Sequence, residues 1–134
     1  MAESFDVQVL NIMVPGTTAA DIVYPLIHIP ACGGAITLLE AQVTCGTPSN
    51  LGSADLWYGT LNAANGTIVP EVCVATGIGT GGGTFPALAP FSLGLQLSPS
   101  VIPANKWLGI IIGTAADAGQ QWVTIAYVNG RQIY

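Results

Sequence analysis

The chain has 134 residues, of which 7% are charged, and its two basic and seven acidic residues give a formal net charge of −5. This length is typical of one domain that buries its own core, so we expect a single domain over residues 1–134. The two basic side chains, Lys106 and Arg131, are too few to neutralise several phosphates, which argues against a nucleic-acid-binding protein.

The first predicted strand lies within residues 5–14, FDVQVLNIMV. Val7 and Val9 fall on one of its faces, and Leu10 and Ile12 on the other. A strand that is apolar on both faces is either buried on both or meets a partner. We therefore expect residues 1–16 to form an edge strand or an extended arm that pairs with another subunit.

The next strand is predicted within residues 21–29, DIVYPLIHI, where Pro25 indicates an edge position or a bulge. A period of two places on one face Ile22, Tyr24, Leu26 and His28. Further strands are predicted at 35–45, where alternation outweighs several helix-favouring residues, and at 54–62. Asn65-Gly66 then predicts a hairpin whose returning strand or strands cover residues 68–75.

Residues 91–128 carry the clearest pattern. Alternation predicts one strand from the four residues Phe91, Leu93, Leu95 and Leu97. A turn at 101–106 and strands at 107–112 and 122–128 follow, and Asn129-Gly130 predicts that residues 131–134 fold back. About eight strands with no convincing helix indicate an all-β fold, a single antiparallel β-sandwich or barrel.

No motif announces a chemistry. Residues 77–82 match G-x-G-x-x-G, but Pro86 and Pro90 prevent the helix that dinucleotide binding requires, so we expect a mobile loop at 77–83. His28 is the only histidine and is expected to be a packed or half-exposed strand residue. We assign no catalytic, cofactor-binding or metal-ligating residue and expect no cofactor.

The acidic residues are expected to be solvated surface groups, although two of them could meet as a glycosidase pair. They are Glu3, Asp6, Asp21, Glu40, Asp55, Glu71 and Asp117. The aromatic residues are expected to fill the core or a subunit interface, with a sugar-binding platform as the alternative. They include Trp57, Trp107, Trp122, Tyr24, Tyr58, Tyr127 and Tyr134.

Residues Met1–Asp6 lack a basic region, so we expect no secretory signal and synthesis in a cytosol. There the cysteines, Cys32, Cys45 and Cys73, are expected to be reduced, with a Cys32–Cys45 disulfide as the alternative. No apolar run has the roughly 18 residues of a membrane helix. Hydrophobic residues make up 51% of the chain, which predicts that neighbouring subunits bury part of its surface, with a monomer that has an uncharged surface as the alternative.

Two stretches carry a resemblance, GAITLLEAQVTC at 34–45 and residues 91–128, with IPANKWLGIII and WVTIAYV. The chain resembles small virion structural proteins of tailed bacteriophages. The resemblance implies a jelly-roll-like sandwich that forms a homo-oligomer, often a trimer, and binds the outside of a capsid. It covers core and turn positions, so it implies no functional residues.

The function expected from the residues and the resemblance together is that of a non-enzymatic capsid decoration protein. It would sit on the virion surface, bind the major capsid protein and stabilise the shell. Two alternatives remain open, a tail or fibre subunit and a carbohydrate-binding module.

Overall fold

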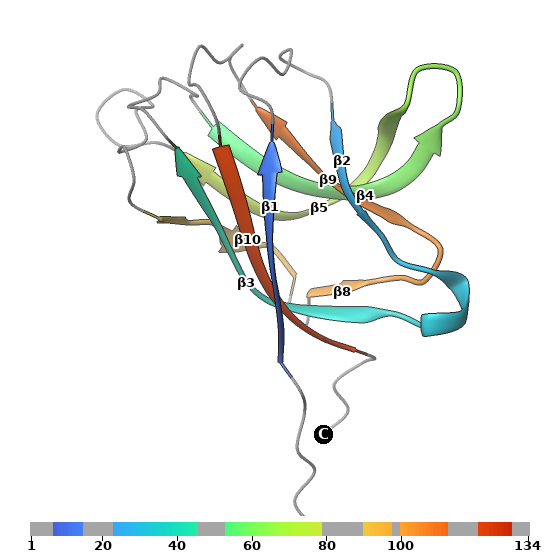
Figure 1. Ribbon diagram of the computed structural model, residues 1–134, viewed down its shortest axis with the longest axis horizontal. Helices are drawn as coiled ribbons and strands as arrows, with labels where there is room; N and C mark the ends of the chain where they lie inside the picture. Colours follow the sequence, from blue (N-terminus) through green and yellow to red (C-terminus); the bar gives the residue numbers. More distant parts are fainter. Residues whose placement is uncertain are drawn as a thin grey trace, which may run out of the picture.

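The computed structural model of the chain describes residues 7–14, 23–45, 53–78, 90–97, 100–112 and 121–129. Within these ranges the chain forms two antiparallel sheets that pack against each other, as Figure 1 shows. Helical structure in the same ranges is limited to the short 3-10 turn η1 (Ala31–Gly33), and none of it is long and apolar enough to cross a membrane. The predicted all-β sandwich is confirmed.

Each sheet contains strands from both the N-terminal and the C-terminal parts of the chain. Sheet A has the order β1 (Gln8–Val14), β10 (Gln121–Asn129) and β3 (Ile36–Cys45), with β6 (Phe91–Ser92) and β8 (Ser100–Ile102) both pairing with β3. Sheet B has the order β2 (Tyr24–His28), β9 (Trp107–Ile112), β4 (Ser53–Asn62), β5 (Thr67–Ile78) and β7 (Gly94–Leu95). Strands β1 and β2 are thus the outermost strands of their sheets.

Each pair of strands encloses the next pair in sequence, as in one long hairpin folded at its middle. Strand β4 pairs with β5, β3 with β8, β2 with β9 and β1 with β10. Winding that hairpin into two layers brings β10 beside β3 and β9 beside β4. This nested and wound pairing is the jelly-roll arrangement. The described residues form eight strand positions when β6, β7 and β8 count as one interrupted strand.

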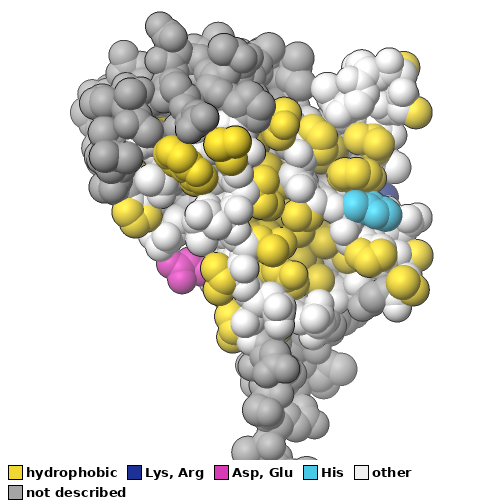
Figure 2. Space-filling view, viewed as in Figure 1, with side chains coloured by type: hydrophobic (Ala, Val, Ile, Leu, Met, Phe, Trp, Pro, Cys, Tyr) yellow, Lys and Arg dark blue, Asp and Glu magenta, His cyan; other side chains and the backbone are white. Residues whose placement is uncertain are grey.

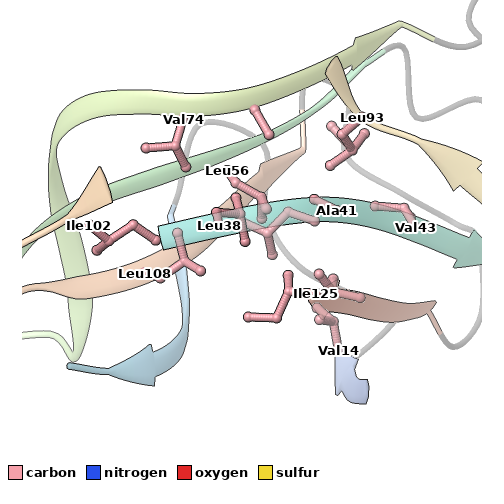
Figure 3. Close-up of a cluster of buried hydrophobic side chains, with 14 of the residues drawn as sticks. Val14, Leu38, Ala41, Val43, Leu56, Val74, Leu93, Ile102, Leu108 and Ile125 are labelled. Carbon is pink, nitrogen blue, oxygen red and sulfur yellow. The ribbon is translucent and has the colours of Figure 1, made fainter. Parts of the chain in front are cut away.

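The core lies between the sheets, where inward-facing side chains of both layers meet (Figure 3). Leu56, Leu108 and Ile125 are fully buried there. Each buried side chain of this size contributes about 1.5–3 kcal/mol to folding. The alternation of buried and half-buried residues along β10 is the pattern expected of a strand with one face on a core.

The β4–β5 hairpin confirms the Asn65-Gly66 prediction. Gly66 has φ 70°, a left-handed conformation that favours glycine. Its N–H donates to the Asn62 carbonyl at 2.9 Å, and the Asn65 Oδ1 accepts from the Thr67 N–H at 3.1 Å. The turn therefore satisfies its own backbone, and the two strands pair along their whole length with two register shifts.

The tip of this hairpin folds over the outer face of sheet B. Ile68 is 4% exposed and lies against the faces of Gly59 and Gly109, where any side chain would collide with it. Its N–H donates to the Val23 carbonyl at 3.2 Å. Val23 is buried as well. A second small apolar contact, separate from the main core, thus joins the hairpin to the segment that precedes β2.

The single strand predicted from Phe91, Leu93, Leu95 and Leu97 is wrong. The chain instead crosses between the sheets at Leu93, so that β6 pairs in sheet A and β7 in sheet B. Leu93 is 5% exposed, whereas Leu95 and Leu97 are 38% and 36% exposed. The crossing occurs because the Leu93 N–H donates to Ala41 of β3, while the Gln96 N–H donates to Val74 of β5.

Two boundaries also differ from the prediction. Ser100–Ile102 forms β8, so the turn before β9 is shorter than the predicted 101–106, with Asn105 at φ 64°. Gly77 and Ile78 belong to β5 and not to a loop. A Cβ on Gly77 would lie 2.5 Å from the Leu93 Cδ2, so this glycine serves packing. The predicted fold-back at 131–134 lies outside the described residues.

The predicted face of β2 needs correction too. The register shifts between Pro25 and Ile27, so Tyr24 pairs with Ile110 while His28 pairs with Trp107. Tyr24 therefore faces the core, and His28 lies on the opposite face, at the outside of sheet B. The bulge is the one that Pro25 indicated, but its effect on side-chain direction was not foreseen. Ile22 lies outside the described residues.

Candidate interaction surface

The described acidic groups are separate from one another. Glu40 on β3 accepts a hydrogen bond from Gln42 Nε2 at 2.7 Å, and Asp55 on β4 accepts one from the Thr76 hydroxyl. Glu71 on β5 forms an ion pair with Lys106, Nζ to Oε2 2.8 Å. The described ranges hold no group of three or more His, Cys, Asp or Glu side chains placed to bind a metal ion. Glu3, Asp6, Asp21 and Asp117 lie outside these ranges.

His28 is exposed and lies beside Trp107, with ring centroids 4.9 Å apart. The sequence predicts a packed or half-exposed strand histidine; the residue lies on a strand and against an aromatic ring, but it is more exposed than predicted. Among the cysteines, Cys32 is exposed, Cys45 is buried and Cys73 is half-buried, and all three are free thiols. Burial raises the pKa of the Cys45 thiol. Burial, and then the charge of Asp55, raise the pKa of Cys73.

The aromatic side chains divide between the core and two outer faces. Tyr24, Tyr58 and Tyr127 pack against the core, as predicted. Trp122 pairs with Met13 and Thr44 and so lies on the outside of sheet A. Trp57 and Trp107 lie on the outside of sheet B, at neighbouring positions of β4 and β9. A platform of all three tryptophans is therefore excluded by geometry.

The outer side of β1 is the most exposed apolar surface of the described chain. Val7, Val9 and Met13 are 54%, 63% and 57% exposed. On the inner side of the same strand, Leu10 and Ile12 are half-buried. We call these five residues the β1 surface. Apolar side chains on both faces of an edge strand confirm the two-faced pattern read from the sequence.

Two hollows flank the β1 surface. On the inner side, a cavity of about 330 Å³ is lined by Leu10, Ile27, Ile36 and Tyr127, with His28 and Asn129 among its polar residues. On the outer side, a smaller hollow of about 130 Å³ is lined by Val9, Glu40, Gln42, Thr124 and Ala126. The inner hollow lies where the β1 and β2 edges of the sandwich approach each other.

Figure 2 shows the same feature as a surface. Hydrophobic side chains gather in a band over β1 and β2 and between them, with the histidine at its margin. The acidic side chain in view lies to the side of this band. The described acids belong to β3, β4 and β5, so β1 and β2 carry none. The band is an apolar, uncharged surface that reaches from one sheet edge to the other.

The free edge of β1 completes the surface. Strand β1 pairs with β10 in an uninterrupted register from Gln8–Tyr127 to Val14–Gln121, and no described residue pairs with its other edge. The strand contains no charged residue and no proline. Charged side chains and prolines on an edge strand usually prevent a further strand from pairing with it, and β1 has neither. Within the described part of the chain, the outer backbone edge of β1 therefore has no strand partner.

Met13 is the residue of this surface that the sequence pattern identified least directly. It lies four positions after Val9, and a period of two places both on the same face. The alternation alone did not reveal that this face is the solvent-exposed one. That depends on β1 being the last strand of its sheet.

Comparisons with known proteins give no relative for the chain. No family model, no curated protein and no solved structure matches it.

Proposed function

We propose that the chain is a non-enzymatic structural subunit of a virion, a capsid decoration (cement) protein that binds the outer surface of the major capsid protein. The observation that carries this proposal is the uncharged, apolar β1 surface, with Val9 63% and Met13 57% exposed. Apolar surfaces of this kind are removed from water when subunits assemble. The resemblance at 34–45 and 91–128 supplies the virion context and favours a homo-oligomer. A trimer is the arrangement that the resemblance implies, whereas the geometry of β1 favours a pair, as argued below.

The proposed mechanism is binding linkage. A subunit that binds the assembled shell, and not its separated parts, shifts the equilibrium toward the shell. At a free concentration of one hundred times Kd, each occupied site adds about 2.7 kcal/mol to the stability of the assembled state. A capsid with many such sites resists heat and internal pressure better when it is decorated.

Stripped and re-decorated particles test this proposal. Capsids of the virus that encodes the chain are stripped, mixed with the purified protein and heated while genome release is followed with a nucleic-acid dye. The decorated particles are expected to rupture at a higher temperature. Equal rupture temperatures at saturating protein would contradict the cement function. Gold-labelled antibodies on intact particles separate a capsid position from the tail or fibre alternative.

A carbohydrate-binding module is the second candidate, because Trp57 and Trp107 lie on one outer face. Half-buried indole rings on a sheet face suit stacking against sugars. Binding on a glycan array that is lost in Trp57→Ala and Trp107→Ala, but kept in the control Trp122→Ala on the other sheet, supports this candidate. An array without any bound glycan contradicts it.

A further inference from the structure

We infer that the free edge of β1 pairs antiparallel with the β1 edge of a second copy, so that sheet A continues from one subunit into the other across a two-fold axis. The inference rests on the geometry of β1 and does not depend on the virion assignment.

The outer edge of β1 has backbone groups that a further strand can pair with. In the described chain, β1 is the outermost strand of sheet A and has seven residues in unbroken register with β10. The N–H and C=O groups on its other edge form a row that a further strand can pair with. The natural occupant is therefore an extended, uncharged strand with apolar side chains on both faces. Strand β1 of a second copy has these properties.

The second step is register. When the seven residues of β1 overlap fully in an antiparallel pair, Asn11 lies on the two-fold axis and faces Asn11 of the other copy. Val9 then lies opposite Met13, and Leu10 opposite Ile12. Residues on the outer side meet residues on the outer side, so the two sheets join without exchanging faces. The Asn11 Oδ1 already accepts from the Thr124 hydroxyl at 3.2 Å.

The third step is charge. Each copy carries a net charge of −5, which opposes self-association unless the contact avoids the acids. The described acids, Glu40, Asp55 and Glu71, lie on β3, β4 and β5. None lies on β1 or β2, the strands that face the second copy. Glu40 lines the hollow beside Val9, but it lies on β3 and is separated from the free edge by β10, so it does not reach the β1–β1 pair.

The fourth step is area. A seven-residue strand is about 24 Å long, and packed sheets lie about 10 Å apart. The strip between the β1 and β2 edges is therefore about 240 Å² on each partner, and the outer side chains of β1 add to it. A contact of this size lies at the small end of protein–protein interfaces, where weaker complexes are found. The hollow beside Leu10 lies within this contact and offers room for side chains of the second copy.

A two-fold axis also closes the assembly. The same edge is used on both subunits, so the pair leaves no second β1 edge open. Pairing β1 with a different edge would instead leave one free edge at each end and would propagate into a ring or a filament. The isologous pair is the smallest arrangement that covers the edge.

The test is a charge swap at Val9 and Met13. The double variant Val9→Glu/Met13→Glu places like charges opposite each other across the axis and is expected to be monomeric. The double variant Val9→Lys/Met13→Glu places opposite charges there and is expected to recover the dimer in low salt. Within one strand the two positions are too far apart to pair. Val69→Glu, at an exposed apolar residue of β5, is the matched control and is expected to remain dimeric.

Native mass from light scattering behind a sizing column is the readout, with circular dichroism to show that each variant is folded. A wild-type monomer, a wild-type trimer, or a dimer that persists in Val9→Glu/Met13→Glu overturns the inference. A monomeric Val9→Lys/Met13→Glu overturns the register. These outcomes do not decide the virion proposal, because rupture of decorated particles is measured separately.

Discussion

At the scale of single residues, Gly59 and Gly109 show how closely the β4–β5 hairpin packs on sheet B. A Cβ on Gly109 would lie 2.6 Å from Ile68 Cδ1 and 2.7 Å from the Tyr24 carbonyl oxygen. A Cβ on Gly59 would overlap the Val69 carbonyl oxygen, which belongs to the backbone. These positions exclude a side chain because of space, since neither has a positive φ.

Gly59→Ala is therefore expected to destabilise the fold by about 3 kcal/mol, because the hairpin backbone must move to admit one methyl group. The urea midpoint measures the effect. Gly94→Ala is the matched control, because its Cβ would meet nothing nearer than the Thr76 carbonyl oxygen at 3.6 Å. That variant should change stability by less than about 0.5 kcal/mol. Equal effects at both positions would argue against the close hairpin packing.

Gln121 is a buried polar residue whose replacement is expected to change the stability of the fold. Its side chain is fully buried beside Val14 and Cys45, and neither amide atom has a hydrogen-bond partner in the described part of the chain. A buried amide without partners costs about 1–3 kcal/mol. Gln121→Met keeps the length and removes the polar atoms, so it should raise the free energy of unfolding by about 1 kcal/mol.

Thermal or urea unfolding measures this gain, with Gln96→Met as the exposed control. Gln96 donates one hydrogen bond to the Gly94 carbonyl at 3.0 Å, and its substitution should alter stability by less than about 0.5 kcal/mol. A Gln121→Met variant that is less stable than the wild type would show that the amide is satisfied in solution.

Because of the buried thiols, we expect the free energy of unfolding to fall at alkaline pH. Burial raises the pKa of Cys45 in the folded state, and burial together with the charge of Asp55 raises that of Cys73, although a hydrogen bond to the Ala75 carbonyl lowers it. As the pH rises above about 8.5, thiols of the unfolded chain ionise first. The unfolded state then binds fewer protons, so the free energy of unfolding falls. Below that pH this contribution to stability is complete.

Urea midpoints at about pH 7.5 and about pH 9.5 measure the fall. The double variant Cys45→Ala/Cys73→Ala should lose less stability between these two pH values than the wild type. Cys32→Ala, at an exposed thiol, is the control and should follow the wild type. Parallel curves for all three proteins would assign the alkaline loss to other groups.

At the scale of elements, the strands that face one core throughout were predictable from sequence. Strand β3 was assigned from alternation, and its observed bounds, Ile36–Cys45, agree with the predicted 35–45. The segment 91–102 was not predictable in the same way. Its alternation continues through Leu97, but the chain changes sheets at Leu93 because backbone partners lie on two different strands. The alternation of apolar and polar residues shows which side chains share one face of a strand. It does not show which sheet supplies the strand's backbone hydrogen bonds.

The β1 surface was predictable in part. Apolar residues on both faces of residues 5–14 already indicated a second contact for this strand. Its place at the end of sheet A depends on pairing with β10, whose residues lie more than one hundred positions away in sequence. The period of two predicts the wrong face for His28 for a related reason, because one bulge reverses the direction of all later side chains in a strand.

At the scale of the whole molecule, the low content of charged residues determines how self-association depends on salt. The described cation Lys106 is engaged by Glu71, and the β1 surface carries no charge. Self-association through this surface should therefore depend little on salt. We expect the native mass to stay constant between about 0.05 M and about 1 M salt, a range over which the Debye length falls severalfold. Dissociation at high salt would indicate an interface based on ion pairs.

The most direct test of this account is the native mass of the purified wild-type chain, by light scattering behind a sizing column. Pairing of two β1 edges predicts a dimer of the 13.7 kDa chain that becomes monomeric in Val9→Glu/Met13→Glu. A wild-type monomer at high concentration would contradict the claim that the exposed apolar edge of β1 is an assembly surface between copies.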